Sequence, residues 1–428
     1  MTAVGAARRN QRAAQPVRVA RGPQRDTHEP DYLLLLVIVA LAALGILMVY
    51  SSSGVSSLLR TDDPFAVVGP QALWATLGVI GMVVIMRIDY RHLRTVSVPA
   101  FAVAVVLLVL VLLPPIGPLR PIEVGGATRW LAIGPLPALH PAEFAKLALI
   151  VYLAHWLARR GTRARSLVQG LLPFLLITGP ILLLVYLEPD LGTTGVVTLT
   201  AFTMFFVAGG SIAQLLLLVP AGVAAVAYAV SHSSYQMARV EAFLDPWANP
   251  TGVGYHTVQG LLALGTGGVF GIGLGESRQP GALQLPAAHN DFVFAMVAQE
   301  LGLVGGLVVI GLYLLFAYRG LRIALSAPDT FGALLATGIT AWLGLQAFIN
   351  IGVVVVLLPI TGITLPFLSA GGSSLLVSFA AVGILLSISR ETLARGTWTH
   401  ADPDRGRRYG RAHLPRAGRR ALPVRAVR

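Results

Sequence analysis

The sequence predicts an all-α membrane protein, a polytopic bundle of about ten transmembrane helices. Of its 428 residues, 55% are hydrophobic and only 12% are charged. A soluble domain carries roughly 25% charged residues, so this composition cannot build a water-facing surface. Long apolar runs of about 20 residues match the thickness of a bilayer core. The chain has no cysteine, which excludes disulfides, thiolate metal sites and a cysteine nucleophile.

Ten apolar runs and one large loop define the predicted order of the chain. The runs occupy residues 32–52, 67–86, 96–113, 141–158, 170–187, 191–208, 212–231, 291–318, 330–357 and 371–390. The large loop, residues 232–290, separates the seventh span from the eighth, and the loop at 114–140 is the next longest on the same face. Because loops on a rigid scaffold commonly carry function, we expect the site on this outer face.

The distribution of basic residues predicts that both ends of the chain are cytoplasmic. With ten spans, the segments assigned to the inner face hold 26 of the 32 lysines and arginines. Such a bias is typical of cytoplasmic loops. Residues 1–31 are then a disordered basic arm, and residues 391–428 a basic tail, because their composition cannot bury a core. Topology explains these arginines more simply than binding to nucleic acid does, so no nucleic acid is expected as a partner.

Asp291 is the most informative carboxylate, because it closes the large loop immediately before the eighth span. A carboxylate that faces a membrane-level cavity loses hydration, which raises its pKa and makes it a better base. The alternative is a structural role, in which Asn290 or Asp291 caps the free N–H groups of the eighth helix. The spacing alone leaves both interpretations open.

Lys146 is the only lysine of the chain and lies inside the fourth predicted span. Glu143 precedes it by three residues and shares its helix face. A charged pair within a membrane indicates function, and a compact ammonium group suits a pyrophosphate. Alternatively, Lys146 extends to the outer surface with Glu143 as its local partner. Glu300 lies deeper, in the eighth span, and is expected to neutralise Lys146 or to tune the site.

Three further charged residues border the predicted spans. Arg129 stands beside Trp130, which suggests either an anchor at the membrane interface or a phosphate ligand. In the sequence Glu188-Pro189-Asp190, proline ends the fifth helix and Asp190 is expected to cap the sixth. Two carboxylates this close could hold a divalent cation, but nothing nearby completes a coordination shell. We therefore assign no metal ligands and no certain cofactor, with a divalent cation left open.

Six motifs, in the same order along the chain, resemble the SEDS family, to which FtsW, RodA and their sporulation relative belong. The motifs are Gly126-Ala127-Thr128-Arg129-Trp130, His140-Pro141-Ala142-Glu143-Phe144-Ala145-Lys146-Leu147, Glu188-Pro189-Asp190-Leu191-Gly192-Thr193, Phe243-Leu244-Asp245-Pro246 with Gly254-Tyr255-His256 and Gln259, Pro286-Ala287-Ala288-His289-Asn290-Asp291-Phe292 with Glu300-Leu301-Gly302, and Asn350-Ile351-Gly352 with the segment 365–374. The chain departs from the family pattern at five positions, namely His140, Ala142, Asn290, Gln299 and Ala370. None of these departures removes a carboxylate or cation of the expected site.

The resemblance implies a peptidoglycan glycosyltransferase that acts on lipid II at the outer face of the bacterial cytoplasmic membrane. It implies Asp291 as the catalytic base and Arg129 and Lys146 as pyrophosphate ligands. The residues expected beside the substrate are Glu143, Glu300 and His289, and those expected in a structural role or at the site are Glu188, Asp190, Asn350 and Ser373. The implied partners are lipid II, a class B penicillin-binding transpeptidase and other membrane proteins of the divisome or elongasome.

Two other functions fit the same predicted topology. A lipid II flippase also needs a polar cavity between spans, although alternating access favours inverted repeats and midplane charges, and the sequence shows no clear repeat. A scaffold that only recruits a transpeptidase needs neither chemistry nor transport. The motifs are shared by the division and elongation types, and overall similarity slightly favours the division type.

Overall fold

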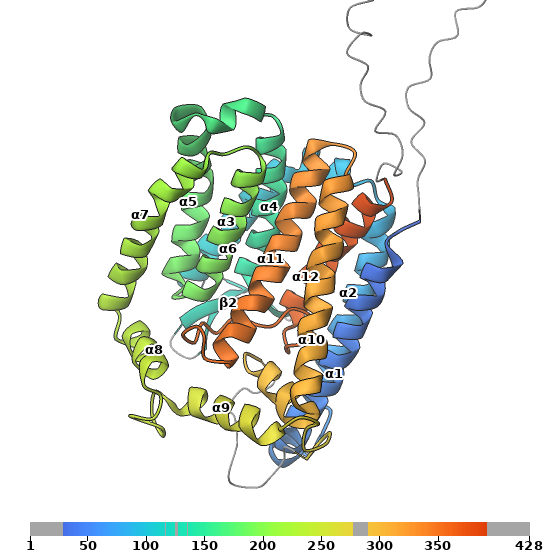
Figure 1. Cartoon of the computed structure of the whole chain (residues 1–428), viewed down its shortest axis with the longest axis vertical. Helices are drawn as coiled ribbons and strands as arrows, with labels where there is room; N and C mark the ends of the chain where they lie inside the picture. The colour runs from blue at the N-terminus through green and yellow to red at the C-terminus, as the bar shows by residue number, and fades with distance from the viewer. Residues whose placement is uncertain (1–28, 116, 125–126, 135, 277–289, 392–428) are drawn as a thin grey trace, which may run out of the picture.

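The computed structural model describes residues 29–391 except 116, 125–126, 135 and 277–289, and these residues form a bundle of helices (Figure 1). A helix lies at each of the ten predicted positions. The helices are α1 (Tyr32–Thr61), α2 (Val68–Arg87), α3 (Leu93–Leu112), α4 (Pro141–Ala158), α5 (Leu172–Leu187), α6 (Leu191–Val207), α7 (Ile212–Ser231), α10 (Val293–Ser326), α11 (Thr330–Val354) and α12 (Gly372–Ser389). The predicted helical membrane bundle is therefore confirmed.

Within the described residues, eight helices are long and apolar enough to cross a membrane. The two others at predicted spans are α6, which has 17 residues, and α4, which buries Glu143 and Lys146. The number of ten crossings thus stays a prediction. The basic arm and tail predicted over 1–31 and 391–428 fall, apart from residues 29–31 and 391, outside the described residues.

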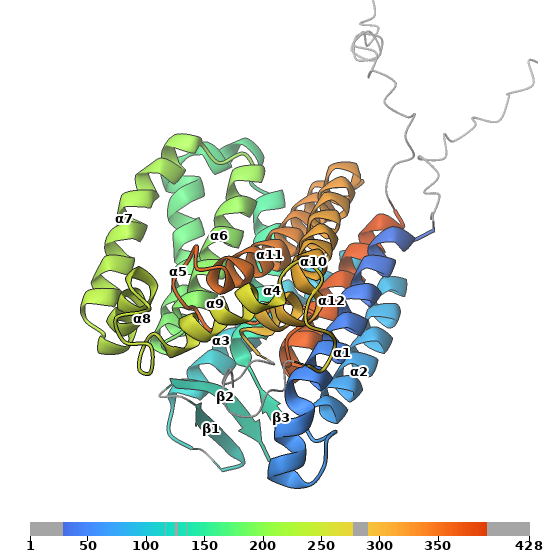
Figure 2. The ribbon, with the colours of Figure 1, turned by 60° about the horizontal axis from the view of Figure 1, so that its bottom comes forward.

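The predicted outer loop at 114–140 contains a small β-sheet, which the all-α prediction missed. Strands β1 (Leu119–Val124), β2 (Ala127–Ile133) and β3 (Leu136–Leu139) pair antiparallel in that order. Prolines at 121 and 137 obscured this sheet in the sequence, because proline interrupts strand patterns and is confined to edges. Figure 2 shows the sheet covering one end of the bundle.

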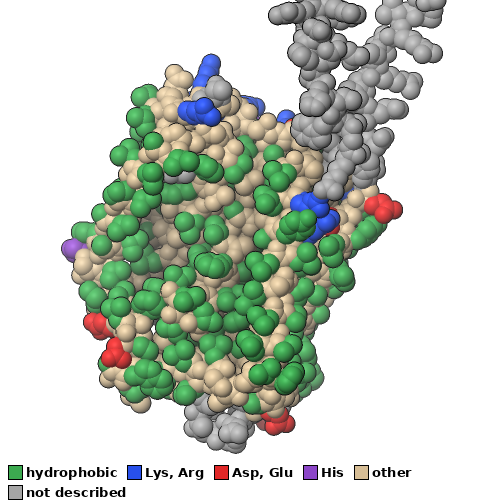
Figure 3. Space-filling view, in the orientation of Figure 1, with side chains coloured by type: hydrophobic (Ala, Val, Ile, Leu, Met, Phe, Trp, Pro, Cys, Tyr) green, Lys and Arg blue, Asp and Glu red, His purple; other side chains and the backbone are tan. Residues whose placement is uncertain are grey.

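The large loop also has structure of its own, namely the short helices α8 (Ser234–Leu244) and α9 (Tyr255–Gly267). They lie at the same end of the bundle as β2, opposite the end where α1 begins and α12 finishes (Figure 1). The two ends of the described chain are close together, since Asp31 N donates to Ser389 Oγ at 3.2 Å. On the face shown in Figure 3, basic side chains gather near that end, and a broad hydrophobic surface covers the rest.

Helix α10 is interrupted at Gly302, whose φ of 69° is in the left-handed region that favours glycine. The interruption is paired with the end of the large loop. Gly273 N donates to Glu300 O at 3.1 Å, and Leu303 N donates to Gly268 O at 2.9 Å. The loop is thereby joined by backbone hydrogen bonds to the helix that follows Asp291, which limits how the start of α10 can move.

Whether β1 and the segment after α4 lie on opposite sides of the membrane can be tested by cysteine labelling, because the chain has no cysteine of its own. In right-side-out membrane vesicles, we expect a cysteine at Glu123→Cys in β1 to react with a membrane-impermeant maleimide. A cysteine at Arg163→Cys, beyond α4, should react only after permeabilisation, because α4 places it on the other face. The parent chain is the control and should remain unlabelled. Equal labelling of both variants in sealed vesicles would contradict a crossing by α4.

Candidate functional site

A cavity of ≈ 240 Å³ lies where the sheet meets the bundle. It is lined by residues from β2, the starts of α4 and α6, the segment before α10, α11 with the segment that follows it, and the start of α12. These residues are Arg129, Trp130, His140, Glu143, Lys146, Asp190, Thr193, Asn290, Asp291, Gln346, Gly362, Ile363, Thr364, Ala370, Gly371 and Ser374. Five residues singled out from the sequence therefore meet at one cavity, among them Asp291 and Lys146, which are far apart in the chain.

Lys146 is buried, with 3% of its side chain exposed, and forms an ion pair with Glu143 at 2.8 Å. The pair is the one expected from their spacing, and the burial rules out a lysine that extends to the surface. Lys146 Nζ also donates to Gln346 Oε1 at 2.8 Å and lies 5.1 Å from the centre of the Trp342 ring. The cation is thus held by α4 and α11, and Gln346 is fixed in turn because it donates to the carbonyl of Thr364 at 2.9 Å.

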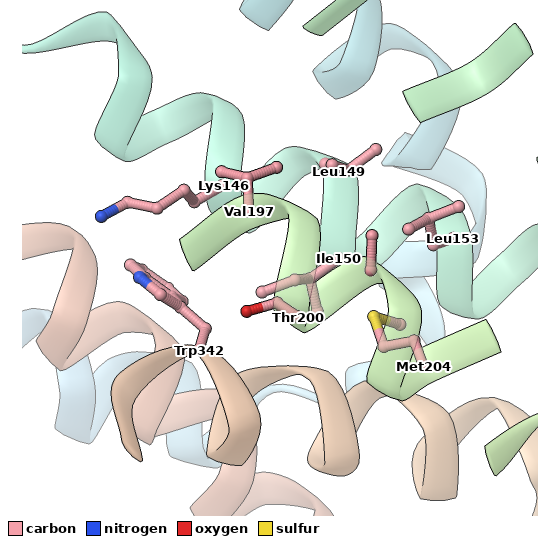
Figure 4. A pocket seen from close by; sticks show the side chains of 9 residues that line it. Lys146, Leu149, Ile150, Leu153, Val197, Thr200, Met204 and Trp342 are labelled. Carbon is pink, nitrogen blue, oxygen red and sulfur yellow. The ribbon is translucent and has the colours of Figure 1, made fainter. Parts of the chain in front are cut away.

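A second, smaller pocket of ≈ 10 Å³ begins on the other side of Lys146, between α4, α6 and α11. Its walls are mostly apolar, and Figure 4 shows the Lys146 ammonium group extending away from it, beside Trp342. A volume of about 10–15 Å³ holds a single water molecule. The pocket cannot accept a substrate, so the larger cavity is the candidate site.

Asp291 is placed by hydrogen bonds to the backbone around it. Asn350 Nδ2 on α11 donates to the Asp291 carbonyl at 2.9 Å, and Ser369 Oγ donates to the carbonyl of Asn290 at 2.6 Å. The N-cap of α10 is Phe292, and no side-chain hydrogen bond caps this helix. The alternative role of Asn290 or Asp291 as a helix cap is therefore wrong, and the Asp291 carboxylate faces the cavity instead.

Burial is the main reason that the pKa of Asp291 is raised to about 6. Arg239 and Arg129 oppose this shift because a positive charge favours the carboxylate, whereas Asp190 reinforces it. A carboxylate with this pKa is mostly ionised at neutral pH and is still basic enough to accept a proton. These are the properties of a general base.

Arg129 and Arg239 approach Asp291 around Gly362. A Cβ atom at Gly362 would lie 3.6 Å from Asp291 Oδ2, 3.6 Å from Arg239 Nη2 and 3.9 Å from Arg129 Nη1. Arg129 is oriented by its donation to the carbonyl of Glu188 at 3.2 Å, and Arg239 by stacking 4.4 Å above the Tyr235 ring. One carboxylate and two guanidinium groups thus face the same position.

Arg239, on α8, is a site residue that was not predicted. The signal that could have found it is the rarity of basic residues in the outer segments, which hold only six of the 32. Arg129 is another of those six and was singled out because Trp130 follows it. Arg239 lies in the large loop without such a neighbour, and only the tertiary structure brings it to Asp291.

Glu300 is not where the sequence placed it. Its carboxylate is buried and accepts hydrogen bonds from Ser51 on α1, at 2.6 Å and 2.7 Å. It does not line the cavity, and the carboxylate paired with Lys146 is Glu143. The expectation that Glu300 neutralises Lys146 is therefore wrong, because Glu300 lies on the side of α10 that packs against α1.

Three other residues named from the sequence are Asp190, Ser373 and His289. Asp190 caps α6 as expected, since it accepts from Thr193 N at 2.9 Å, and it also lines the cavity. Ser373 does not line the cavity itself, but its Oγ accepts a hydrogen bond at 3.2 Å from the backbone N–H of His140, which does. His289 lies outside the described residues. Across those residues, no group of three or more His, Asp or Glu side chains is arranged to hold a metal ion.

Glu188 is completely buried, and both its carboxylate oxygens lack a hydrogen-bond partner among the described residues. Burial, reinforced by the charge of Asp190, raises the pKa of Glu188 to about 9. The side chain is therefore protonated at neutral pH and does not act as an anion. Its contribution to the site is its backbone carbonyl, which orients Arg129.

The buried pair of Lys146 and Glu143 gives a stability prediction. Lys146→Leu leaves the Glu143 carboxylate buried without its cation, and we expect this to reduce the free energy of unfolding by about 3–5 kcal/mol. Thermal unfolding of the purified proteins in one detergent measures the loss. The double variant Glu143→Leu with Lys146→Leu is the matched control and should recover most of the stability, because no uncompensated charge remains. Equal losses in the single and double variants would show that the charge is not the cause.

The family model described as cell cycle protein, which covers FtsW, RodA and SpoVE, matches residues 31–394. Stage V sporulation protein E of Bacillus subtilis (strain 168) is 42% identical over 84% of this chain and 97% of its own length. The probable peptidoglycan glycosyltransferase FtsW of Trichlorobacter lovleyi is also 42% identical, over 84% of this chain and 93% of its own. The chain therefore belongs to the FtsW, RodA and SpoVE family of cell cycle proteins.

Solved structures are similar over the same region. A chain from a structure described as the structural coordination of polymerization and crosslinking by a peptidoglycan synthase complex has a TM-score of 0.69 and 31% identity, covering 84% of this chain and 98% of its own. The rod shape determining protein RodA of Thermus thermophilus has a TM-score of 0.61 and 29% identity, covering 85% of this chain and 98% of its own. The similarity extends over the whole helical bundle.

Proposed function

We propose that this protein is a peptidoglycan glycosyltransferase that polymerises lipid II on the outer face of the bacterial cytoplasmic membrane. The observation that carries the proposal is the single cavity at which Asp291 meets the cations Arg129 and Lys146. The relative from Trichlorobacter lovleyi is named as a probable enzyme of this kind. Strand β2 and the starts of α4 and α6, which contribute to the cavity lining, lie at the end of the bundle opposite the two ends of the described chain, which agrees with cytoplasmic termini and an outward-facing site (Figure 1).

The proposed reaction is a single displacement at the anomeric carbon of the donor. Asp291 takes the proton from the 4-hydroxyl of the acceptor sugar, and the resulting oxygen attacks the donor. The bond to undecaprenyl pyrophosphate breaks, and the charge that develops on this leaving group is stabilised by Arg129 and Lys146. One catalytic carboxylate with a good leaving group fits inversion at the anomeric carbon, by analogy with inverting glycosidases.

The partners proposed for this activity follow from the same assignment. Lipid II is the substrate, and a class B penicillin-binding transpeptidase crosslinks the glycan strands that this chain makes. The similarity to a chain of a peptidoglycan synthase complex supports a crosslinking partner. Other membrane proteins of the divisome or elongasome are proposed as further partners.

The alternative of a lipid II flippase is less consistent with where the charges lie. The cavity residues that could contact a headgroup come from the sheet, from helix starts and from connecting segments at one end of the bundle. An alternating-access carrier is expected to hold its substrate near the membrane midplane. A polymerase needs a polar site at one face only.

Polymerisation by the purified full-length protein tests the proposal directly. With fluorescent lipid II, Asp291→Asn should lower the rate of glycan synthesis by about 10²–10⁴-fold, because a general base typically contributes a factor of this size. The matched control is Glu123→Gln on β1, an exposed carboxylate outside the cavity, which should polymerise at the parent rate. Transbilayer movement of lipid II without polymer would favour the flippase. The absence of both activities would favour a scaffold.

The acid limb of the pH profile tests the role of Asp291 as a base. Below a pH of about 6 the carboxyl holds its proton and cannot accept another, so kcat/KM should fall as the pH drops through this value. The charged groups that act on Asp291 are Arg129 on β2, Arg239 on α8 and Asp190 before α6. Because Asp190 raises the pKa of Asp291, Asp190→Asn should move the limb to lower pH. A limb that stays in place, or moves upward, would contradict this assignment.

A further inference from the structure

The cations around Asp291 differ in whether a carboxylate of the protein already pairs with them. Lys146 is paired with Glu143 and donates to Gln346, so its charge is compensated by a neighbour on its own helix. Arg129 and Arg239 form no ion pair with any carboxylate of the described residues. Both guanidinium groups are therefore available to an anion in a way that the lysine is not.

Each arginine is held in place by groups other than a carboxylate. Arg129 uses Nε and Nη2 to donate to the carbonyls of Glu188 and Pro189, which leaves Nη1 as the nitrogen nearest the position above Gly362. Arg239 stacks on Tyr235 and donates to its hydroxyl from Nη2. A guanidinium group has five N–H donors, so both residues retain donors for a ligand.

The three charged groups do not balance one another. Two guanidinium groups face one carboxylate, and burial lowers the pKa of Arg239, as expected for a cation that lacks a paired anion. Glu188, whose carbonyl accepts from Arg129, has a pKa raised to about 9 by burial and therefore adds no negative charge at neutral pH. Asp190, a second carboxylate of the cavity, acts on Arg239 as well, yet neither arginine forms an ion pair with a carboxylate of the described residues, so both cations remain open to an anion beside the proposed base.

We propose that Arg129 and Arg239 form a two-arginine site that binds the diphosphate of the lipid-linked substrate beside Asp291. Planar guanidinium groups suit the paired oxygens of phosphate groups, and a diphosphate offers one phosphate to each. The inference rests on the proposed function and adds Arg239 to Arg129 and Lys146 as a third cation that acts on the diphosphate. A ligand group that packs against Gly362 lies near the base and both guanidinium groups, as the reacting part of a substrate between an attacking hydroxyl and a leaving diphosphate must.

The glycine at 362 is part of this arrangement. Its φ of 74° is in the left-handed region, and its missing side chain leaves open the position that the three charged groups surround. A methyl group there would be in van der Waals contact with all three of them. The glycine therefore permits the close approach of a ligand to the backbone.

Binding of undecaprenyl diphosphate to the full-length protein in nanodiscs tests the inference without turnover. Arg239→Gln should weaken the affinity about tenfold or more, because a charge-assisted hydrogen bond and its charge are lost. The affinity of the same variant for undecaprenyl monophosphate should fall less, and its affinity for undecaprenol should not change. Arg239→Lys should recover part of the affinity, since the charge is restored without the planar geometry. Arg120→Gln, on the exposed part of β1, is the matched control and should bind as the parent does.

Two outcomes would overturn the inference. Unchanged binding of the diphosphate to Arg239→Gln would show that Arg239 is not a ligand. Equal loss for diphosphate and undecaprenol, with a lowered unfolding temperature, would show that the substitution only damages the fold.

The same experiment separates the inference from the polymerase assignment. If the parent protein binds undecaprenyl diphosphate through Arg239 but makes no glycan from lipid II, the polymerase assignment fails and the diphosphate site stands. If polymer forms and Arg239→Gln binds the diphosphate normally, the polymerase assignment stands and the site fails.

Discussion

The cost of burying charge in an apolar bundle governs the arrangement of this protein. A charged side chain within a membrane must face the protein interior or a polar cavity and find a partner there. Lys146 does so with Glu143 and Gln346, which come from two helices. Asp291 does so with two arginines across a cavity rather than with a direct ion pair. The first arrangement satisfies the charge within the protein, whereas the second leaves it able to act on a ligand.

The scaffold around Asp291 is held mainly through its backbone. Asn350 and Ser369 donate to the carbonyls of Asp291 and Asn290, and among the described residues the carboxylate itself forms no hydrogen bond that fixes its position. The interruption of α10 at Gly302 adds a second connection, from the end of the large loop to the same helix. A base whose support does not use its own oxygens keeps those oxygens free for the substrate.

Arg239 lies on α8, in the large loop that follows α7. Helix α7, which precedes α8, lies at the side of the bundle and exposes most of its side chains (Figure 1). Arg129, by contrast, extends from a sheet and is tied to the turn between α5 and α6. The two arginines proposed to bind the diphosphate therefore come from different kinds of element, a short helix of the large loop and a strand of the sheet.

The sequence by itself determined the features that depend on local periodicity. The helical runs, the pairing of Glu143 with Lys146 and the cap at Asp190 all follow from spacing within one or two turns of a helix. Motif resemblance then pointed to Asp291. Tertiary structure alone decided which side chains meet across long separations: Gln346 with Lys146, Ser51 with Glu300, and Arg239 with Asp291. The physical reason is that helical periodicity specifies which face of a helix is polar, but packing decides which neighbour that face meets. The sheet at 119–139 was also not predicted from the sequence, because its strands are short, contain prolines and are stabilised by pairing with one another.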